Sequence, residues 1–288
     1  MTRALQQERA LRPAEAEAAD GGRGLWPRLR GYGELLRDRA SGAAPEMESA
    51  KSLCRRLEGR YRPGMSVLDV GCGAGHYLRS LRSRLDPEID YTGVDLTVSF
   101  LALGRRVFPD VPLAGGDAFA LPFPDRSFDL VLCSNLLLHL PPPPDRPLAE
   151  LARVARERLL VRTPVGERNY LVQEVREAEE VAGGGPGGGA GEPRPGWPDE
   201  SVPGDELFDE AGTPRRFNHF NLYTEEYLTR AARRAAPGAR IHLEPDRCFK
   251  PFDNRADTTS TGTRVAGGRQ VAGNLLLEWA WLEVERSA

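Results

Sequence analysis

Short apolar segments alternate with amphipathic segments through most of the chain. The apolar segments end at glycine, aspartate or serine, and the segments between them repeat apolar residues at spacings of three and four. The first pattern is typical of buried strands and the second of amphipathic helices. The predicted strands are Ser66–Val70, Asp90–Val94, Pro112–Ala114, Phe128–Cys133, Arg158–Arg162, Arg240–Leu243 and Asn274–Val284.

Four amphipathic segments are predicted as the helices of this alternation. They are His76–Leu85, Val98–Phe108, Asp145–Glu157 and Thr224–Ala235. Asp145 and Thr224 are predicted N-caps, because a side-chain oxygen at that position can accept a hydrogen bond from a free backbone N–H. Strands that alternate with helices predict a doubly wound α/β sheet of seven strands with helices on both faces. We expect a mostly parallel sheet with an antiparallel last strand.

The N-terminal part departs from this alternation. Residues 1–24 have the composition of a flexible tail. Residues 25–60 are predicted as a helical flap, with one helix around Trp26–Leu36 and another from Pro45 to about Gly59. The alternating pattern begins after this flap, so the main domain is predicted to span residues 61–288.

Two further stretches interrupt the main domain. A glycine- and proline-rich insertion at about 165–217 has the length of a lid or substrate loop, and a disordered linker without function is the alternative. Phe249–Gly273 is polar and rich in turn residues, so it is predicted as a loop between the last two strands.

Charge and cysteine usage narrow the class of protein. The 288 residues carry a net charge of −3, and arginines interleave with acids without forming a basic block. Such a distribution disfavours nucleic acid as the main partner. The four cysteines have neither metal-binding nor redox spacing. With no apolar run long enough to cross a bilayer and no apolar signal core, we expect a cytoplasmic protein without a membrane span.

Three glycines, spaced two residues apart, separate the first predicted strand from the first predicted helix. They are Gly71, Gly73 and Gly75. Glycine permits the positive φ of a sharp turn, and the helix that follows presents free N–H groups to a ligand. This turn is therefore predicted to form the floor of a nucleotide-type site. His76 replaces the third glycine of a dinucleotide fingerprint, which disfavours NAD or FAD.

Two aspartates follow the next two predicted strands. Asp95 ends the second strand, where a carboxylate can accept hydrogen bonds from ribose hydroxyls. Asp117 follows the third strand, where it can accept from an adenine amine while the N–H of Ala118 meets a ring nitrogen. A helix N-cap or turn aspartate is the alternative for each. Because the carboxyl ends of parallel strands share one edge of a sheet, all three features are expected at one site.

This set of motifs resembles the class I S-adenosylmethionine-dependent methyltransferases, which have a Rossmann-like fold. The similar segments are Val67–Gly75, Tyr91–Asp95, Gly116–Ala118, Leu121–Val131 and Ser134–Leu140. The last of these resembles the small-molecule subgroup that includes quinone-biosynthesis enzymes, described as methyltransferase type 11. The resemblance is close over about residues 60–165.

The resemblance implies S-adenosyl-L-methionine as cofactor and S-adenosyl-L-homocysteine as product. Asp69 and Gly71 would contact the methionine part, and Cys133 or Ser134 would offer a backbone carbonyl to its amino group. The complete set of implied cofactor-binding residues is Asp69, Gly71, Cys72, Gly73, Gly75, Asp95, Leu96, Asp117, Ala118, Cys133 and Ser134.

Two histidines are the predicted catalytic residues. A methyl group is transferred by in-line displacement, so alignment and exclusion of water come first, and a base helps when the acceptor is a hydroxyl. His139 follows the fourth strand and His219 follows the insertion, each with ordinary packing as the alternative. His76 and Tyr223 are weaker candidates. No acid cluster follows the fourth strand, so no metal is expected.

The expected function is methyl transfer to oxygen, nitrogen or carbon of a small-molecule acceptor. A protein or RNA methyltransferase is one alternative, although no Asn/Asp-Pro-Pro-aromatic motif follows the fourth strand. A catalytically silent module that binds the cofactor is the other alternative. The sequence leaves the acceptor, the methylated atom and the oligomeric state open.

Overall fold

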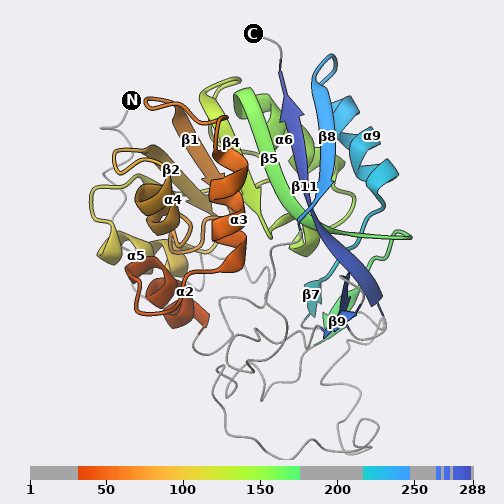
Figure 1. Cartoon of the computed structure of the whole chain (residues 1–288), viewed down its shortest axis with the longest axis horizontal. Helices are drawn as coiled ribbons and strands as arrows, with labels where there is room; N and C mark the ends of the chain where they lie inside the picture. Colours follow the sequence, from red (N-terminus) through yellow and green to blue (C-terminus); the bar gives the residue numbers. More distant parts are fainter. Residues whose placement is uncertain (1–31, 176–216, 247–263, 267–268, 273–274, 287–288) are drawn as a thin grey trace, which may run out of the picture.

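The computed structural model describes residues 32–175, 217–246, 264–266, 269–272 and 275–286 (Figure 1). Its helices are α2 (Tyr32–Ser41), α3 (Glu48–Leu57), α4 (Leu78–Arg84), α5 (Val98–Val107), the 3-10 helix η3 (Leu137–His139), α6 (Asp145–Val154) and α9 (Glu225–Ala235). Its strands are β1 (Ser66–Val70), β2 (Asp90–Asp95), β3 (Leu113–Gly115), β4 (Phe128–Ser134), β5 (Ala155–Gly166), β6 (Gln173–Val175), β7 (Phe217–His219), β8 (Arg240–Pro245), β9 (Arg264–Ala266), β10 (Arg269–Ala272) and β11 (Leu275–Glu285). The predicted tail and most of the predicted insertion lie outside the described residues.

The main sheet has the order β3-β2-β1-β4-β5-β11. All neighbours from β3 to β5 are parallel, and β11 is antiparallel to β5. Along its other edge β11 pairs with β8, again antiparallel. These seven strands confirm the predicted Rossmann-like α/β sheet with its antiparallel last strand.

A strand pair extends the sheet where the sequence predicted only a loop. Within Phe249–Gly273, β9 and β10 form an antiparallel pair, and β10 pairs with the start of β11. The prediction was wrong because β11 runs past the end of β8: its first residues pair with β10, whereas β8 pairs only from Ala280 onward. An unpaired strand edge there would leave backbone groups without partners, and β10 supplies them.

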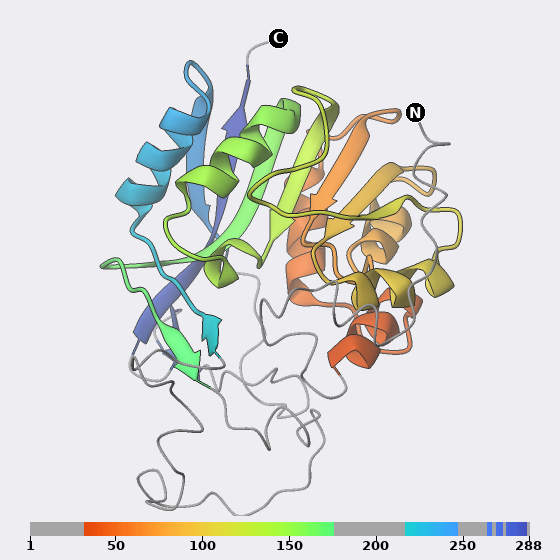
Figure 2. The ribbon, with the colours of Figure 1, turned by 180° about the vertical axis from the view of Figure 1, so that it is seen from behind.

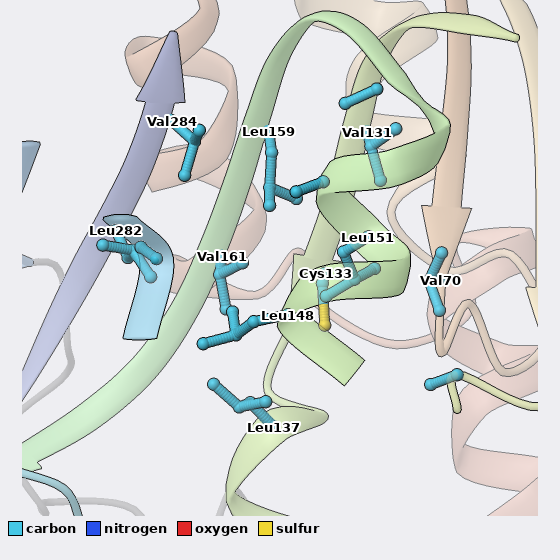
Figure 3. Close-up of a cluster of buried hydrophobic side chains, with 14 of the residues drawn as sticks. Val70, Val131, Cys133, Leu137, Leu148, Leu151, Leu159, Val161, Leu282 and Val284 are labelled. Atoms are coloured by element: carbon cyan, nitrogen blue, oxygen red, sulfur yellow. The ribbon is translucent and has the colours of Figure 1, made fainter. Parts of the chain in front are cut away.

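Successive residues of the central strands pack on opposite faces of the sheet. Val67 and Leu130 face the cluster that contains α3 and α4, whereas Leu68 and Val131 face the cluster that contains α6 and α9. Figures 1 and 2 show these helix pairs on the two faces, and Figure 3 shows the α6 side of the core. Burial of each such side chain stabilises the fold by roughly 1.5–3 kcal/mol. The predicted coverage of both faces is confirmed.

The boundary between α6 and β5 differs from the prediction. The helix ends at Val154, three residues before Glu157, and the strand begins at Ala155. Ala155 pairs with Phe128 of β4, and the two strands shift register before Leu130 pairs with Arg158. Long-range pairing with β4 therefore makes Ala155–Glu157 part of the strand, although the sequence continues the helical pattern.

One of the two predicted N-caps is confirmed. The Oγ1 of Thr224 accepts a hydrogen bond from the N–H of Tyr227 at 3.2 Å. The prediction that Asp145 is an N-cap was wrong, because Pro144 occupies the N-cap position of α6. The carboxylate of Asp145 instead accepts hydrogen bonds from the Tyr227 hydroxyl at 3.0 Å and from Nε of Arg234 at 3.1 Å. These bonds tie α6 to α9.

Two helices, α2 and α3, lie in the described part of the predicted flap. Helix α2 runs to Ser41, past the predicted end near Leu36, and Trp26 lies outside the described residues. Leu36 and Ala40 of α2 pack against Ala74 in the glycine turn and Phe100 of α5. Helix α2 is therefore part of the packed structure at the carboxyl end of β1. None of the described helices has the length and apolarity that a bilayer span requires.

The two ends of the predicted insertion come together beside the main sheet. β6 and β7 pair antiparallel, with Gln173 opposite His219. The pairing continues at Tyr170 and Leu222, whose backbones exchange two hydrogen bonds of 2.8 Å. This small sheet brings β7 close to η3, which follows β4, because the carbonyl oxygen of His219 lies 2.9 Å from Nδ1 of His139.

Candidate active site

The glycine turn after β1 is hydrogen-bonded to the end of β2. The N–H groups of Gly71 and Cys72 donate to the carbonyl of Val94 at 2.7 and 3.1 Å. The N–H of Gly73 donates to Oδ2 of Asp95 at 2.8 Å. The turn and the acid, which the sequence predicted separately, therefore form one structural unit.

All three glycines of the turn have positive φ, with values of 80° at Gly71, 57° at Gly73 and 74° at Gly75. A Cβ on Gly71 would lie 2.9 Å from Cδ2 of Leu136, and one on Gly73 would lie 3.0 Å from Cδ1 of Leu36. The positive φ favours glycine at both positions, and at Gly71 the nearby Leu136 side chain also leaves little space for a Cβ.

Asp95 uses its carboxylate to organise two turns. Besides the Gly73 N–H, it accepts the N–H of Thr97 on Oδ1 at 2.8 Å, just before α5 begins. Leu96 lies between these residues with a side chain that is 40% exposed. The predicted ribose acid thus lies at the surface of the strand ends, next to an exposed apolar side chain.

Asp117 lies at the same edge, after β3. The N–H of Gly116 donates to the carbonyl of Asp95 at 3.1 Å, and Oδ1 of Asp117 accepts the N–H of Phe119 at 2.9 Å. The second bond is that of a turn aspartate. The Ala118 side chain packs into the core, so this residue can present only backbone groups to a ligand. The three predicted features are adjacent, as the fold requires.

Asp69 is buried one residue from the end of β1. Its Oδ2 accepts the hydroxyl of Tyr91 at 2.7 Å, and its side chain is almost fully shielded from solvent. Burial raises the pKa of Asp69 to about 7; the Tyr91 hydrogen bond opposes the rise and the nearby charge of Asp95 adds to it. A cationic group bound above the turn would favour the ionised form.

Both cysteines of the predicted set have fully buried side chains. Cys72 and Cys133 are 0% exposed, and burial raises the pKa of each thiol, to about 12 for Cys133. Figure 3 shows the Cys133 sulfur among the aliphatic side chains of the core. Only the backbone of either cysteine can face a ligand, and Ser134 ends β4 beside them with a buried side chain.

His76 lies in the turn before α4, which begins at Leu78 instead of at His76 as predicted. Its Nδ1 lies 3.4 Å from the position of a Cβ on Gly73. Burial, with a smaller effect of the Arg39 cation, lowers the pKa of His76 to about 3. The imidazole is therefore neutral at physiological pH, and its contacts are those of a residue that supports the glycine turn.

The two predicted catalytic histidines lie next to each other. Nδ1 of His139, in η3, lies 2.9 Å from the carbonyl oxygen of His219, in β7. Because a carbonyl only accepts, Nδ1 carries the proton and the lone pair is on Nε2. Burial lowers the pKa of His139 to about 4 and also lowers the pKa of His219. His139 is thus a neutral imidazole that joins the end of β4 to the segment after the insertion.

Tyr223, another candidate base, belongs to the core. Its side chain packs in the cluster beneath α6 and α9, and its ring stacks on Tyr227 with centroids 5.5 Å apart. Burial raises its pKa above the usual range. These surroundings make it a packing residue.

A buried polar group beside Ser134 was missed in the sequence. It consists of Tyr77, Asn135, Arg162 and Asp246, joined by direct hydrogen bonds. One indication of this group was present in the sequence: Arg162 is a charged residue within an apolar strand segment, where a buried charge needs a partner. Within the described residues, no three His, Cys, Asp or Glu side chains gather as a metal site would require.

Residues 67–158 match a family described as a methyltransferase domain. Over 94 residues the chain is 39% identical to the demethylmenaquinone methyltransferase of Renibacterium salmoninarum, a match that covers 33% of this chain and 38% of that protein. It is also 39% identical over 99 residues to the ubiquinone/menaquinone biosynthesis C-methyltransferase UbiE of Bordetella avium, with the same two shares. The matched part therefore spans less than half of either relative.

Solved structures share the fold over a larger part of the chain. Phosphoethanolamine N-methyltransferase 2 of Haemonchus contortus, in complex with S-adenosyl-L-methionine, superposes with a TM-score of 0.54 at 16% identity and covers 92% of this chain and 60% of that one. The cyclase SpnF gives a TM-score of 0.50 at 21% identity, with 86% and 85% covered. The family match covers the strand ends described above, because residues 67–158 include the glycine turn, Asp95 and Asp117. Residues 67–158 are therefore similar to a methyltransferase domain, and the chain shares its fold with these solved structures.

Proposed function

We propose that the chain transfers a methyl group from S-adenosyl-L-methionine to a small-molecule acceptor. The observation that carries this proposal is the hydrogen bond from the Gly73 N–H to the Asp95 carboxylate. It joins a turn of positive-φ glycines to an acid at the next strand end, with Asp117 at the strand end after that. The proposal takes 61–288 as the methyltransferase domain and 25–60 as its flap.

The residues at the strand ends fit this cofactor. A carboxylate at Asp95 can accept from ribose hydroxyls, and Asp117 with the Ala118 N–H can hold adenine. A Cβ at Gly71 or Gly73 would contact Leu136 or Leu36, so glycine lets these two side chains pack close to the turn. The backbone carbonyl of Cys133 or Ser134 would hold the methionine amino group. When bound, S-adenosyl-L-methionine supplies an activated methyl group on a sulfonium.

The chain contributes chiefly alignment and shielding. Helix α2 packs against the glycine turn through Leu36, and the ring of Tyr32 lies 5.7 Å from that of Phe100. Burial raises the pKa of Tyr32 to about 12, so its hydroxyl stays protonated. Holding reactants in line and excluding water can together lower a barrier by roughly 7–11 kcal/mol.

The weak basicity of His139 limits the kinds of acceptor that it could deprotonate. An imidazole with a pKa of about 4 is a poor base for an alcohol. An acceptor that needs little base, such as an acidic carbon or a neutral amine, fits this environment better. The quinone-biosynthesis names of the two relatives support a quinone-type carbon acceptor within that class.

A second candidate is a cofactor-binding protein that performs another reaction or none. The specific observation in its favour is the cyclase SpnF, which has the same fold over most of this chain. The fold alone therefore does not establish methyl transfer.

We also propose a cytoplasmic location. The free thiols of Cys54, Cys72 and Cys133 support it, and cell fractionation tests it.

The purified chain should transfer labelled methyl groups from S-adenosyl-L-methionine to at least one member of a panel of small acceptors that includes hydroxylated quinone precursors. An Asp95→Ala variant serves as the negative control. Label that appears in added protein or RNA instead would favour a macromolecular acceptor. Cofactor binding without transfer to any member of a broad panel would favour the second candidate.

A further inference from the structure

Asn135 has an unusual backbone conformation at the end of β4. Its φ is 61°, in the left-handed region, directly after Ser134. This region is unfavourable for residues other than glycine, although asparagine tolerates it better than most. Such a conformation persists where surrounding contacts hold it, and it is frequent near functional sites.

Three hydrogen bonds hold Asn135 in this conformation. Its N–H donates to the carbonyl of Arg162 at 3.0 Å, and its Oδ1 accepts from Nη1 of Arg162 at 2.6 Å. Its Nδ2 donates to the hydroxyl of Tyr77 at 3.3 Å, and that hydroxyl donates to Oγ of Ser49 at 2.9 Å. Arg162 therefore holds both the backbone and the side chain of Asn135.

Arg162 is itself fixed on its other sides. Its Nε donates to Oδ2 of Asp246 at 2.5 Å, and its guanidinium carbon lies 4.1 Å from the ring centroid of Trp279. Oδ1 of Asp246 accepts the hydroxyl of Ser52 in α3 at 2.8 Å. The Arg162 side chain is 5% exposed, so this arrangement also neutralises a buried charge.

The two neighbours of Asn135 belong to the cofactor site of the proposed function. Ser134 precedes it, and Leu136 follows it with a side chain packed against Gly71. A change in the backbone at Asn135 would therefore turn the Ser134 carbonyl and move Leu136 against the glycine turn together. Both effects act on the part of the site that would hold the methionine group.

We propose that Arg162 is a positioning residue, which acts through Asn135 to set the backbone of Ser134 and Leu136 for cofactor binding. This inference rests on the proposed function. It assigns a role to a buried residue that acts through Asn135. It also explains why a buried ion pair lies next to the site rather than elsewhere in the core.

The test is calorimetric titration with S-adenosyl-L-homocysteine of five proteins: the parent chain and four variants of it. Arg162→Lys keeps the charge beside Asp246 but cannot also make the directed bond to Asn135. Asn135→Gly removes the side chain that Arg162 and Tyr77 hold, and glycine allows the left-handed backbone without being fixed in it. The double variant measures the coupling between the two. Arg230→Lys is the matched control, because Arg230 also lies over an aromatic ring, that of Tyr227, but is exposed on α9.

We expect each single variant to bind the product about tenfold more weakly, and the double variant to be no weaker than the worse single variant. The control should bind as the parent chain does. If Arg162→Lys does not fold, Tyr77→Phe together with Asn135→Gly carries the same comparison.

A purely structural role predicts a different result. The variants would melt at a lower temperature, yet their folded form would bind the product within about twofold of the parent chain, and this would overturn the inference. Multiplied losses in the double variant would also overturn it, because they would show that the two residues act separately. A parent chain that binds neither S-adenosyl-L-methionine nor its product would refute the proposed function first.

Discussion

The backbone N–H of Gly73 donates to the carboxylate of Asp95, with 2.8 Å between the nitrogen and Oδ2. This bond joins the glycine turn after β1 to the end of β2. The other carboxylate oxygen accepts the N–H of Thr97 at 2.8 Å, before α5 begins. One side chain therefore fixes two of the loops that would surround the cofactor, and changes to it should affect both binding and stability.

Asp95→Ala is expected to weaken the binding of S-adenosyl-L-methionine by about 1.5–3 kcal/mol, because charge-assisted hydrogen bonds to the ribose would be lost. Calorimetric titration measures this directly. Asp90→Ala is the matched control, since Asp90 begins the same strand and is exposed. Unchanged affinity in a folded Asp95→Ala protein would refute the ribose assignment.

Gly71→Ala is expected to destabilise the fold more than Gly59→Ala. Both glycines have similar positive φ, 80° and 71°, so both variants incur a left-handed penalty of roughly 1–2 kcal/mol. A Cβ at Gly71 also lies 2.9 Å from Leu136, whereas no heavy atom is within 4 Å of one at Gly59. The close contact should add about 1–3 kcal/mol. Urea unfolding checks the difference, and equal losses would contradict it.

The buried carboxyl of Asp69 should make stability depend on pH. Its pKa is about 7 in the folded chain and 3.8 as the ordinary value, so the folded chain binds the extra proton between these values. The free energy of unfolding of the parent chain, relative to Asp69→Asn, should therefore fall as pH rises from about 4 to about 7. Urea unfolding of both proteins across this range measures the difference. Parallel curves would mean that Asp69 has no raised pKa.

His139 should have the opposite effect in much of the same range. Its pKa is about 4 in the folded chain against 6.5 ordinarily, so the unfolded chain binds the extra proton between these values. The contribution of His139 to stability should be complete above pH 6.5 and decrease as pH falls toward 4. His139→Asn keeps a donor for the His219 carbonyl but does not titrate. The gap between the parent chain and this variant should narrow at low pH, and a constant gap would rule out the lowered pKa.

Features that depend only on residues close together in the chain could be predicted from the sequence. The apolar strand β1, the glycines that follow it and the acid that ends β2 are each recognisable within a few residues. Their assembly at one edge then follows from the parallel order of the strands. The fold and the positions of Asp95 and Asp117 could therefore be predicted.

Long-range contacts could not be predicted. Arg162 and Asp246 are 84 residues apart and Asn135 and Arg162 are 27 apart, so no local pattern connects them. The start of β5 at Ala155 likewise depends on pairing with β4, and β10 depends on the free edge of β11. The low pKa of His139 comes from burial under a segment that returns only after the insertion.

The central claim is that the strand ends around Gly73 and Asp95 bind S-adenosyl-L-methionine. Calorimetric titration of the full chain with this cofactor and with S-adenosyl-L-homocysteine tests it most directly. We predict saturable binding of both, at one molecule per chain, and weaker binding of both to the Asp95→Ala variant. Absence of binding by either molecule to the folded parent chain would contradict the account.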